Sequence, residues 1–369
     1  MDDYAYMAQA LRLAAHGLYT TEPNPRVGCV LVRDAQVVGE GWHRRVGGPH
    51  AERIALTAAG EAARGATAYV TLEPCCHQGR TPPCTDVLLA AGVTRVVAAM
   101  VDPNPLVAGK GLALLEAAGV AVESGLTETQ ARALNPGFIK RMAKGLPYVR
   151  CKLAASLDGR TAMASGESQW ITGEAARRDV QFLRARSSAI LTGVGTVLAD
   201  DPSMNVRLQP TDLPGLEPTE AVRQPLRVVV DSRLRTPPGA RLLGLPGMTL
   251  IACTDQPAPA IAVLESAGAL VEVLPEGRGR VDLESLLRHL AEQEVNEVLI
   301  EAGPTLAGAA VAAGLVDELV LYLAPHLMGD AARGLFHLPG LERMAERIPL
   351  TLTDVRAVGQ DWRLTARLG

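Results

Sequence analysis

The sequence is poor in aromatic residues and has no run of positive charge. Phe, Trp and Tyr make up 3% of its 369 residues, and the formal net charge at pH 7 is −4. Proteins that bind nucleic acid typically combine basic surfaces with aromatic side chains on which bases stack. Because both features are missing, we expect no nucleic-acid partner.

Long apolar runs are missing as well. No stretch reaches the roughly 18 apolar residues that a membrane-spanning helix needs. The first residues, Met1-Asp2-Asp3-Tyr4, have neither the basic nor the apolar region of a secretory signal. We therefore expect no membrane partner and a cytoplasmic location.

Cysteine is scarce and unevenly placed. Three of the six cysteines, Cys75, Cys76 and Cys84, lie within ten residues of each other. Clustering around one motif is typical of a metal site rather than of a disulfide framework, and it indicates a reducing compartment.

Two short stretches carry the clearest chemistry: His50-Ala51-Glu52, and the segment from Pro74-Cys75 to Cys84. A zinc ion held by His50, Cys75 and Cys84 has three protein ligands, so its fourth position is open for water, whose pKa the metal lowers to about 7. Glu52 is then free to move protons, as the carboxylate of zinc deaminases does. The pattern matches H-x-E followed by P-C-x-x-C, except that eight residues separate the two cysteines.

Two alternatives remain open for this cluster. Cys76 or His77 could supply a fourth ligand, which would make the zinc structural. The cysteines could also be buried apolar residues with no metal at all.

The length predicts two domains, with a boundary at Gly145-Leu146-Pro147. In the first domain, residues 1–145, we expect strands that alternate with helices, hence an α/β/α sandwich with a partly parallel sheet. Its first helix should run from Asp3 to His16 and stop at Gly17, and a later helix should open at His50. The second domain, residues 146–369, again predicts α/β, with an irregular surface loop at residues 208–225. Expected strands lie at residues 27–33, 36–42, 67–72, 95–101, 120–123, 148–154, 189–192, 226–230, 248–252, 271–274, 297–300 and 319–323.

The second half contains two glycine turns that follow predicted strands, Gly193-Val194-Gly195-Thr196 and Glu301-Ala302-Gly303-Pro304. Backbone N–H groups at such turns bind pyrophosphate, but neither turn fits the G-x-G-x-x-G fingerprint, and both could be plain strand-to-helix connections. Several charged residues accompany them, which are either ligand groups or surface charges: Lys152, Asp158, Arg184, Asp200 and Arg207.

Longer motifs give the whole chain a family resemblance. They are EPNPRVGC at residues 22–29, PCCHQGRTPPC at 74–84, CKLAASLDGRTA at 151–162, SGESQWITG at 165–173, TGVGTVLADDP at 192–202, VVVDSRLRTP at 228–237 and EAGPTLAG at 301–308. The first half resembles the cytidine-deaminase-like superfamily, and the full length resembles the bifunctional deaminase-reductases of riboflavin biosynthesis. The resemblance implies a C-terminal domain of the dihydrofolate-reductase-like α/β fold.

By this resemblance, the first domain removes the 2-amino group of a phosphoribosylamino-diaminopyrimidinone by hydrolysis with Zn²⁺. The second domain reduces the ribosyl group to ribityl with NADPH. Family positions make His50, Cys75 and Cys84 the zinc ligands and Glu52 the proton shuttle. Lys152 is expected near the site of hydride delivery, and the Arg184 and Arg207 pair is expected at the phosphate. The expected substrate residues are Asn24, His43, Arg80, Ser168, Arg184, Met204, Arg207 and Glu301. The expected cofactor residues are Ala154, Trp170, Thr196, Asp200, Ser232, Gly303, Pro304 and Thr305.

Two further hypotheses are a deaminase of nucleosides or tRNA with a binding module, and a scaffold around a structural metal. The first would need a basic, aromatic surface, and the second a four-ligand site. A homo-oligomer, dimer or tetramer, is expected because soluble enzymes commonly form one.

Overall fold

The structure, a computed structural model, describes residues 2–77, 82–277 and 279–368. It divides into two compact units. The first comprises the residues up to Gly145 together with Gln209–Ala221, and the second comprises Leu146–Leu208 and the residues from Val222 onward. Among the described residues, no helix combines the length and the apolar character needed to cross a bilayer.

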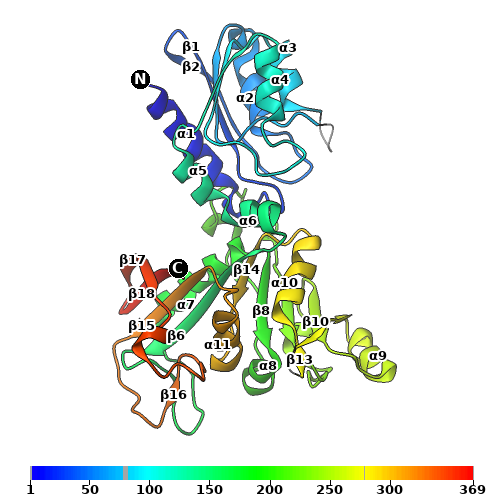
Figure 1. Ribbon diagram of the computed structural model, residues 1–369, viewed down its shortest axis with the longest axis vertical. Coiled ribbons are helices and arrows are strands. Elements are labelled where there is room, and N and C mark those ends of the chain that lie inside the picture. Colours follow the sequence, from blue (N-terminus) through cyan, green and yellow to red (C-terminus); the bar gives the residue numbers. More distant parts are fainter. Residues whose placement is uncertain (1, 78–81, 278, 369) are drawn as a thin grey trace. The chain divides into compact units, whose positions relative to one another are not determined.

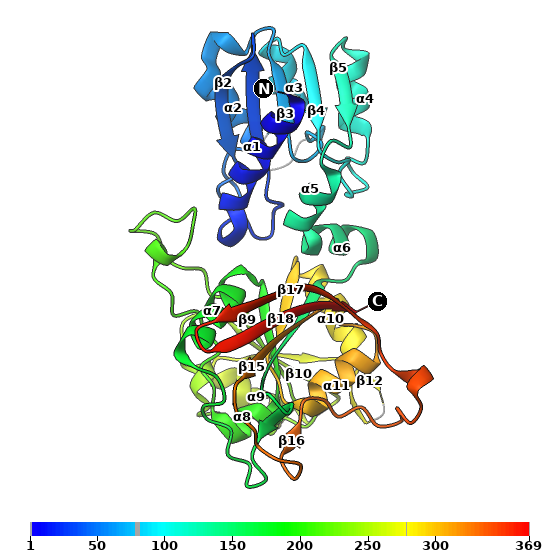
Figure 2. The same cartoon turned by 90° about the vertical axis from the view of Figure 1, so that its left-hand side faces the viewer.

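The first unit is built on a five-stranded sheet in the order β2-β1-β3-β4-β5 (Figure 2). The strands are β1 (Gly28–Arg33), β2 (Gln36–Trp42), β3 (Thr67–Val70), β4 (Arg95–Ala98) and β5 (Ala121–Ser124). Strand β1 runs antiparallel to β2 and β3, whereas β3, β4 and β5 are parallel. The helices are α1 (Asp3–Ala15), α2 (Ala51–Ala59), α3 (Cys84–Ala90), α4 (Lys110–Ala117), α5 (Glu128–Leu134) and α6 (Pro136–Lys144), with 3-10 turns at His16–Tyr19, Gly60–Ala63 and Pro210–Asp212.

Helices cover both faces of this sheet (Figure 1). Along β1, Val30 and Val32 pack against α1, α5 and α6, whereas Cys29 and Leu31 pack on the opposite face against α2, α3 and α4. A strand buried on both faces has a continuous apolar sequence instead of an alternating one. The predicted α/β/α sandwich is therefore confirmed.

The second unit contains a nine-stranded sheet in the order β11-β10-β9-β8-β14-β6-β15-β18-β17. Its strands are β6 (Tyr148–Ser156), β8 (Ala189–Gly193), β9 (Leu226–Val230), β10 (Thr249–Cys253), β11 (Leu270–Val273), β14 (Glu297–Ile300), β15 (Glu318–Ala324), β17 (Leu350–Val358) and β18 (Asp361–Leu368). Short pairs join β7 (Arg160–Ala162) to β16 (Arg333–Gly334) and β12 (Glu276–Gly277) to β13 (Arg280–Val281). The first seven strands of the main sheet are parallel, and the last two are antiparallel.

Helices again lie on both faces of the sheet. They are α7 (Glu174–Arg186), α8 (Val194–Asp200), α9 (Ala258–Ser266), α10 (Leu283–Glu292) and α11 (Pro304–Ala312), with 3-10 turns at Arg241–Leu243 and Met344–Glu346. One face of the central strands packs with α10 and α11, and separate clusters form with α7 and with α8 and α9. The expected second α/β domain is confirmed, and the structure shows that its sheet is largely parallel.

Two local predictions need correction. Helix α1 ends at Ala15, and the chain continues as a 3-10 turn instead of stopping at Gly17. Gly17 is needed for close packing, because a Cβ there would lie 2.7 Å from the Thr21 Cγ2 atom. The C-terminal hairpin of β17 and β18 was not predicted, although its alternating apolar residues and the turn glycine Gly359, with φ of +64°, are hairpin signals.

Candidate active sites

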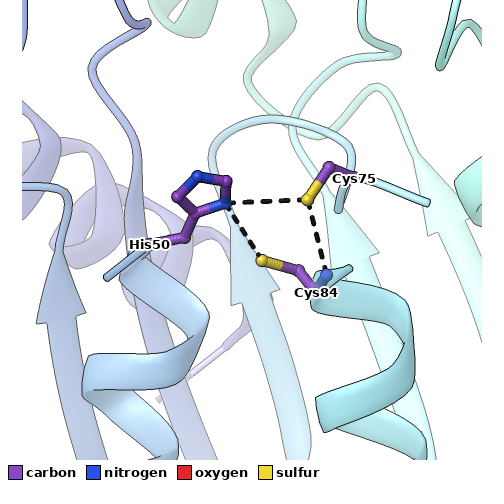
Figure 3. Close-up of side chains that lie close together, drawn as sticks. All are labelled: His50, Cys75 and Cys84. Atoms are coloured by element: carbon purple, nitrogen blue, oxygen red, sulfur yellow. Dashed lines mark hydrogen bonds between the residues drawn. The ribbon is translucent and has the colours of Figure 1, made fainter. Parts of the chain in front are cut away.

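A group of three metal-binding side chains lies in the first unit. The ligand atoms of His50, Cys75 and Cys84 all lie within 4.8 Å of one another. The His50 Nδ1 atom is 3.3 Å from the Cys84 sulfur and 3.6 Å from the Cys75 sulfur (Figure 3). Within the described part of the chain, no other His, Cys, Asp or Glu ligand atom joins this group, so neither Cys76 nor His77 completes a four-ligand site.

Two helix starts position the ligands, as the sequence predicts. His50 is the N-cap residue of α2, and Cys84 is the first residue of α3 (Figure 3). The first N–H groups of a helix have no partner inside the helix, and the Cys84 N–H donates to the Cys75 sulfur at 3.4 Å. The helix start therefore stabilises negative charge on that sulfur.

The electrostatics of the three side chains suit a soft divalent metal. The hydrogen bond from Cys84 lowers the pKa of Cys75 to about 4, and His50 contributes in the same direction. The pKa of Cys84 is raised by its hydrogen bond with Cys75 and by burial. One imidazole and two sulfurs at this spacing form a donor set typical of zinc. The residues present thus fit the metal that the sequence predicts.

Glu52 is the second residue of α2 and is only 3% exposed. Its Oε2 atom has no hydrogen-bond partner among the described residues. Burial raises the pKa of this carboxyl group. A buried polar atom without a partner is rare unless it has a function or a bound water, which agrees with a proton-transfer role.

Two predicted substrate residues lie beside the ligands. The His43 ring packs edge-on against His50 with 5.3 Å between ring centroids. Its Nδ1 atom is 3.1 Å from the Pro49 carbonyl oxygen, so Nδ1 carries the proton, and Nε2 accepts from the Asn24 side-chain amide at 3.0 Å. Burial lowers the pKa of His43, which favours this neutral form. Arg80, the third predicted residue, lies outside the described residues.

In the second unit, charged side chains from three elements meet. Arg184 of α7 donates from Nε and Nη2 to the two oxygens of Glu301, at 2.6 and 2.9 Å. Its Nη1 donates to the Asn205 carbonyl oxygen at 3.1 Å. The ammonium group of Lys152 on β6 makes no hydrogen bond with the described residues, and burial lowers its pKa, with Glu301 acting in the opposite direction. Glu301 thus sits between two cationic side chains.

Of the other predicted substrate residues, Arg207 lies close enough to this group to interact with it: burial and the Arg184 charge lower the pKa of Arg207, and Glu301 acts in the opposite direction. Arg207 is exposed, and its backbone N–H donates to the Gln181 side chain at 2.9 Å. Met204 is buried with φ of +47°, an uncommon conformation for a residue with a side chain. Ser168 is half-buried in the segment that leads to α7.

The predicted cofactor residues gather mainly at strand ends. Strands β8 and β14 are parallel neighbours, and the next residues start helices α8 and α11, with Gly193 and Gly303 as N-caps. A Cβ on Gly193 would lie 3.3 Å from Leu306, so the two helix starts approach closely. Such an edge, with two helix N-termini, is where parallel α/β sheets bind phosphates.

The remaining residues predicted to bind the cofactor come from several elements. Thr196 lies in the first turn of α8, whereas Asp200 is the last residue of that helix. Pro304 and Thr305 open α11, and Ala154 lies on β6. The Ser232 hydroxyl follows β9 and accepts the Val281 N–H at 3.0 Å. Trp170 is 70% exposed, and its ring faces the Arg177 guanidinium, 4.8 Å from the ring centroid.

Sequence reasoning missed Tyr322, a buried residue of β15. Its ring centroid lies 5.9 Å from the Lys152 Nζ atom, and its hydroxyl donates to Asp179 at 2.5 Å. Arg363 donates to the same carboxylate at 2.9 Å. An isolated tyrosine in an apolar strand gives no sequence signal for this network.

A His-Cys-Cys metal site beside a buried glutamate, in an α/β/α sandwich, defines a zinc-dependent deaminase domain. Family comparison agrees, because residues 1–100 match the cytidine and deoxycytidylate deaminase zinc-binding region. Residues 147–364 match the RibD C-terminal domain. The chain as a whole is therefore a deaminase joined to a reductase.

The relatives match the entire chain. It is 55% identical to riboflavin biosynthesis protein RibD of Escherichia coli, over 98% of both chains. It is 49% identical to RibD of Haemophilus influenzae, over 98% of this chain and 96% of the relative. The chain belongs to the RibD family of riboflavin biosynthesis proteins.

Solved structures give the same result. A RibD structure from Acinetobacter baumannii superposes with a TM-score of 0.90 at 48% identity, covering 100% of this chain and 99% of the other. A Thermotoga maritima diaminohydroxyphosphoribosylaminopyrimidine deaminase/5-amino-6-(5-phosphoribosylamino)uracil reductase superposes with a TM-score of 0.85 at 30% identity, with the same coverage. The predicted bifunctional enzyme is confirmed, and the nucleoside or tRNA deaminase and the scaffold hypotheses are not supported.

Proposed function

We propose that the first unit hydrolyses the 2-amino group of 2,5-diamino-6-(5-phosphoribosylamino)pyrimidin-4-one at the His50-Cys75-Cys84 centre. The second unit then reduces the ribosyl group of the product with NADPH, which gives 5-amino-6-(5-phosphoribitylamino)uracil. The boundary between the two activities lies at residues 145 and 146. The observation that carries the proposal is the group of three zinc-type ligands next to Glu52, whose buried Oε2 atom has no hydrogen-bond partner among the described residues. The chain that holds this group is related to RibD over nearly its full length.

In the deaminase site, His50, Cys75 and Cys84 would hold the zinc ion. Zinc supplies Lewis acidity, which makes water a nucleophile at neutral pH. Glu52 takes the proton released from water and delivers it to the leaving amino group, because its raised pKa suits a group that both accepts and donates. Asn24 and His43 orient the pyrimidine ring, and Arg80 holds the phosphate.

In the reductase site, NADPH supplies the hydride. The starts of α8 and α11 hold its phosphates through backbone N–H groups. Thr196, Ser232 and the segment Gly303-Pro304-Thr305 follow the strand ends at this edge, whereas Asp200, Ala154 and Trp170 are assigned to the cofactor by their family positions. These assignments follow the family positions together with the placement of the residues at the strand ends.

The two arginines have different roles in this proposal. Arg184 already donates to Glu301 and to Asn205, so it mainly fixes the Glu301 carboxylate. Arg207 is exposed and has more of its planar fork available for a phosphate. Ser168 and Met204 contribute to the substrate pocket.

The most direct test supplies the diaminopyrimidinone phosphate with and without NADPH. Without NADPH, the deaminated ribosyl compound should accumulate together with ammonia, because hydrolysis needs no reductant. With NADPH, the ribityl product should form and NADPH absorbance should fall in step with it. Reduction of the substrate before any ammonia release would contradict the order proposed here.

Lys152 is proposed to polarise or protonate the sugar end during hydride transfer. Lys152 is the one lysine of the chain after Lys144. Its ammonium group makes no hydrogen bond with a described residue, so it can interact with the substrate. Replacing Lys152 with Met should lower kcat for reduction about a hundredfold, which is the usual size of a general acid/base contribution. Reduction is measured with the deaminated substrate.

Deamination by the same Lys152→Met protein serves as the internal control and should be unchanged. Lys152→Arg keeps the charge at a changed position and should recover part of the activity. A Lys152→Met protein that reduces its substrate at the normal rate would exclude this role.

The chain is further proposed to form a homo-oligomer and to work in the cytoplasm. Strand β17 lies at the edge of its sheet, is exposed along most of its length, and carries Leu350, Leu352 and Val355. Edge strands of this kind pair readily with another chain. In an antiparallel pair of two β17 strands centred on Val355, Asp354 would face Arg356 of the second copy. The six cysteines are all free thiols, in agreement with a reducing compartment.

A further inference from the structure

Glu73 lies two residues before the ligand Cys75 and is 3% exposed. Its carboxylate accepts four backbone hydrogen bonds. Oε2 accepts from the N–H groups of Asp102 and Gly109, at 3.0 and 2.9 Å, and Oε1 accepts from those of Gly111 and Leu112, at 2.9 and 3.2 Å. An ionised carboxylate is an acceptor at both oxygens, so this arrangement uses both of them fully.

These donors come from both ends of one segment. Asp102 follows β4, whereas Gly109 is the N-cap residue of α4, so one side chain closes the loop between them. The N–H groups at the start of α4 have no partner inside the helix, and Glu73 satisfies them from a distant part of the sequence. Glu73 therefore caps α4 and closes the loop before it.

The contacts around Glu73 also hold the backbone next to the metal ligand Cys75. The Glu73 N–H donates to the Met100 carbonyl oxygen at 3.0 Å. A Cβ on Gly111 would lie 2.2 Å from the Pro74 carbonyl oxygen, so α4 packs directly on the residue before Cys75. On the other side, the Cys75 carbonyl oxygen accepts from the Thr85 N–H at 3.2 Å. The Cys75 backbone is thus fixed from both directions.

We propose that Glu73 is a positioning residue of the deaminase, which holds Cys75 at the distance and orientation that metal binding requires. The inference rests on the zinc site proposed above. Glu73 acts through the Pro74 backbone and the start of α4, not by touching the metal or the substrate. Residues that position metal ligands commonly change metal affinity or activity by about tenfold to a hundredfold when they are replaced.

The decisive variant is Glu73→Gln. The amide keeps the size of the side chain but turns one acceptor into a donor, which then faces two backbone N–H groups. Zinc retention against a chelator should weaken by roughly tenfold to hundredfold. The kcat for deamination should fall while KM stays unchanged, because the substrate-binding side chains are untouched. Reduction of the deaminated substrate should be unaffected.

Asp3→Asn is the matched control in the same unit. The Asp3 carboxylate accepts from the Tyr69 hydroxyl at 2.5 Å and from Arg95 at 2.6 Å, and neither partner is a metal ligand. This variant should lower the unfolding temperature without changing zinc retention. Gly111→Ala provides a second variant that keeps the Glu73 carboxylate but disturbs its contact with α4, because the added Cβ would lie 3.1 Å from Glu73 Oε1 as well as 2.2 Å from the Pro74 carbonyl oxygen. It pushes α4 away from Pro74 and should produce the same zinc and kcat defects.

The outcomes distinguish a failure of the proposed metal site from a failure of the positioning role of Glu73. If the unaltered protein retains no zinc, the proposed metal site itself fails. If the unaltered protein retains zinc and both Glu73→Gln and Gly111→Ala retain it equally well, the positioning role is excluded. Equal losses of stability in Glu73→Gln and Asp3→Asn, with zinc retention unchanged in both, would reduce Glu73 to an ordinary structural residue. If Glu73→Gln does not fold, Gly111→Ala decides.

Discussion

Replacing Glu52 with Gln should abolish deamination while reduction proceeds normally. The amide has the same shape but cannot accept the proton from water and pass it to the leaving amine, and such a role is worth about 10²- to 10⁴-fold in rate. Ammonia release from the diaminopyrimidinone phosphate measures the loss. Reduction of the deaminated substrate, followed by NADPH absorbance, measures what remains.

The Glu52→Gln protein should also be at least as stable as the original. Burial raises the pKa of Glu52, which means that the folded state disfavours the charged form. A neutral amide removes this penalty, so the unfolding temperature should stay equal or rise. This combination of lost activity and retained stability is typical of a residue kept for chemistry.

Glu61→Gln is the control for this substitution. Glu61 lies in the 3-10 turn after α2 and is exposed, so its replacement should change neither activity. Full deaminase turnover in Glu52→Gln would show that the proton-transfer assignment is wrong. Loss of reduction as well would indicate a folding defect instead of a missing proton carrier.

Replacing Arg184 with Met should disable the reductase and weaken its fold. The Met side chain leaves the half-buried Glu301 carboxylate, whose side chain is 14% exposed, without its bidentate partner. Because breaking a fully buried pair typically costs about 3–5 kcal/mol of unfolding free energy, the loss here should lie below or at the lower end of that range. The displaced carboxylate should also raise KM for the substrate. Denaturant unfolding and NADPH consumption measure the two effects.

A double variant separates stability from chemistry. Arg184→Met combined with Glu301→Gln removes both charges, so much of the lost stability should return, whereas reduction should stay impaired. Recovery of full reductase activity in the double variant would exclude a functional role for the pair. Arg288→Met tests an exposed pair with Glu284 on α10 and should cost only about 0.3–0.5 kcal/mol.

The fold was predictable from the sequence to the extent that patterns are local. Strands β2, β9 and β14 have the predicted bounds, because each is a continuous segment with distinct flanking residues. The hairpin of β17 and β18 was not predicted although its signals are present, because β17 is exposed and its alternation of apolar and polar residues is interrupted by a register shift between Leu352 and Asp354. The prediction that the first helix stops at Gly17 is wrong, because a glycine needed for close packing cannot be distinguished in the sequence from one needed to end a helix.

The metal-ligand set was predictable for a chemical reason. Imidazole and thiolate are uncommon side chains, and His50, Cys75 and Cys84 stand in short segments that precede helices. These residue types at this spacing favour a zinc site even without any interatomic distance. Lys152, by contrast, could be selected only through the family resemblance, because a lone lysine in a strand has no distinctive local pattern.

The sequence by itself thus determined the two α/β domains, the residues of the metal centre and the class of reaction. The tertiary structure alone decided which partners the buried charges have. Arg184 and Glu301 are 117 residues apart in sequence, and Glu73 reaches the start of α4 across more than thirty-five residues. Such pairs depend on strand order and helix packing, which place distant residues side by side. Local residue patterns carry no information about those distances, whereas ligand chemistry is a property of the side chains themselves.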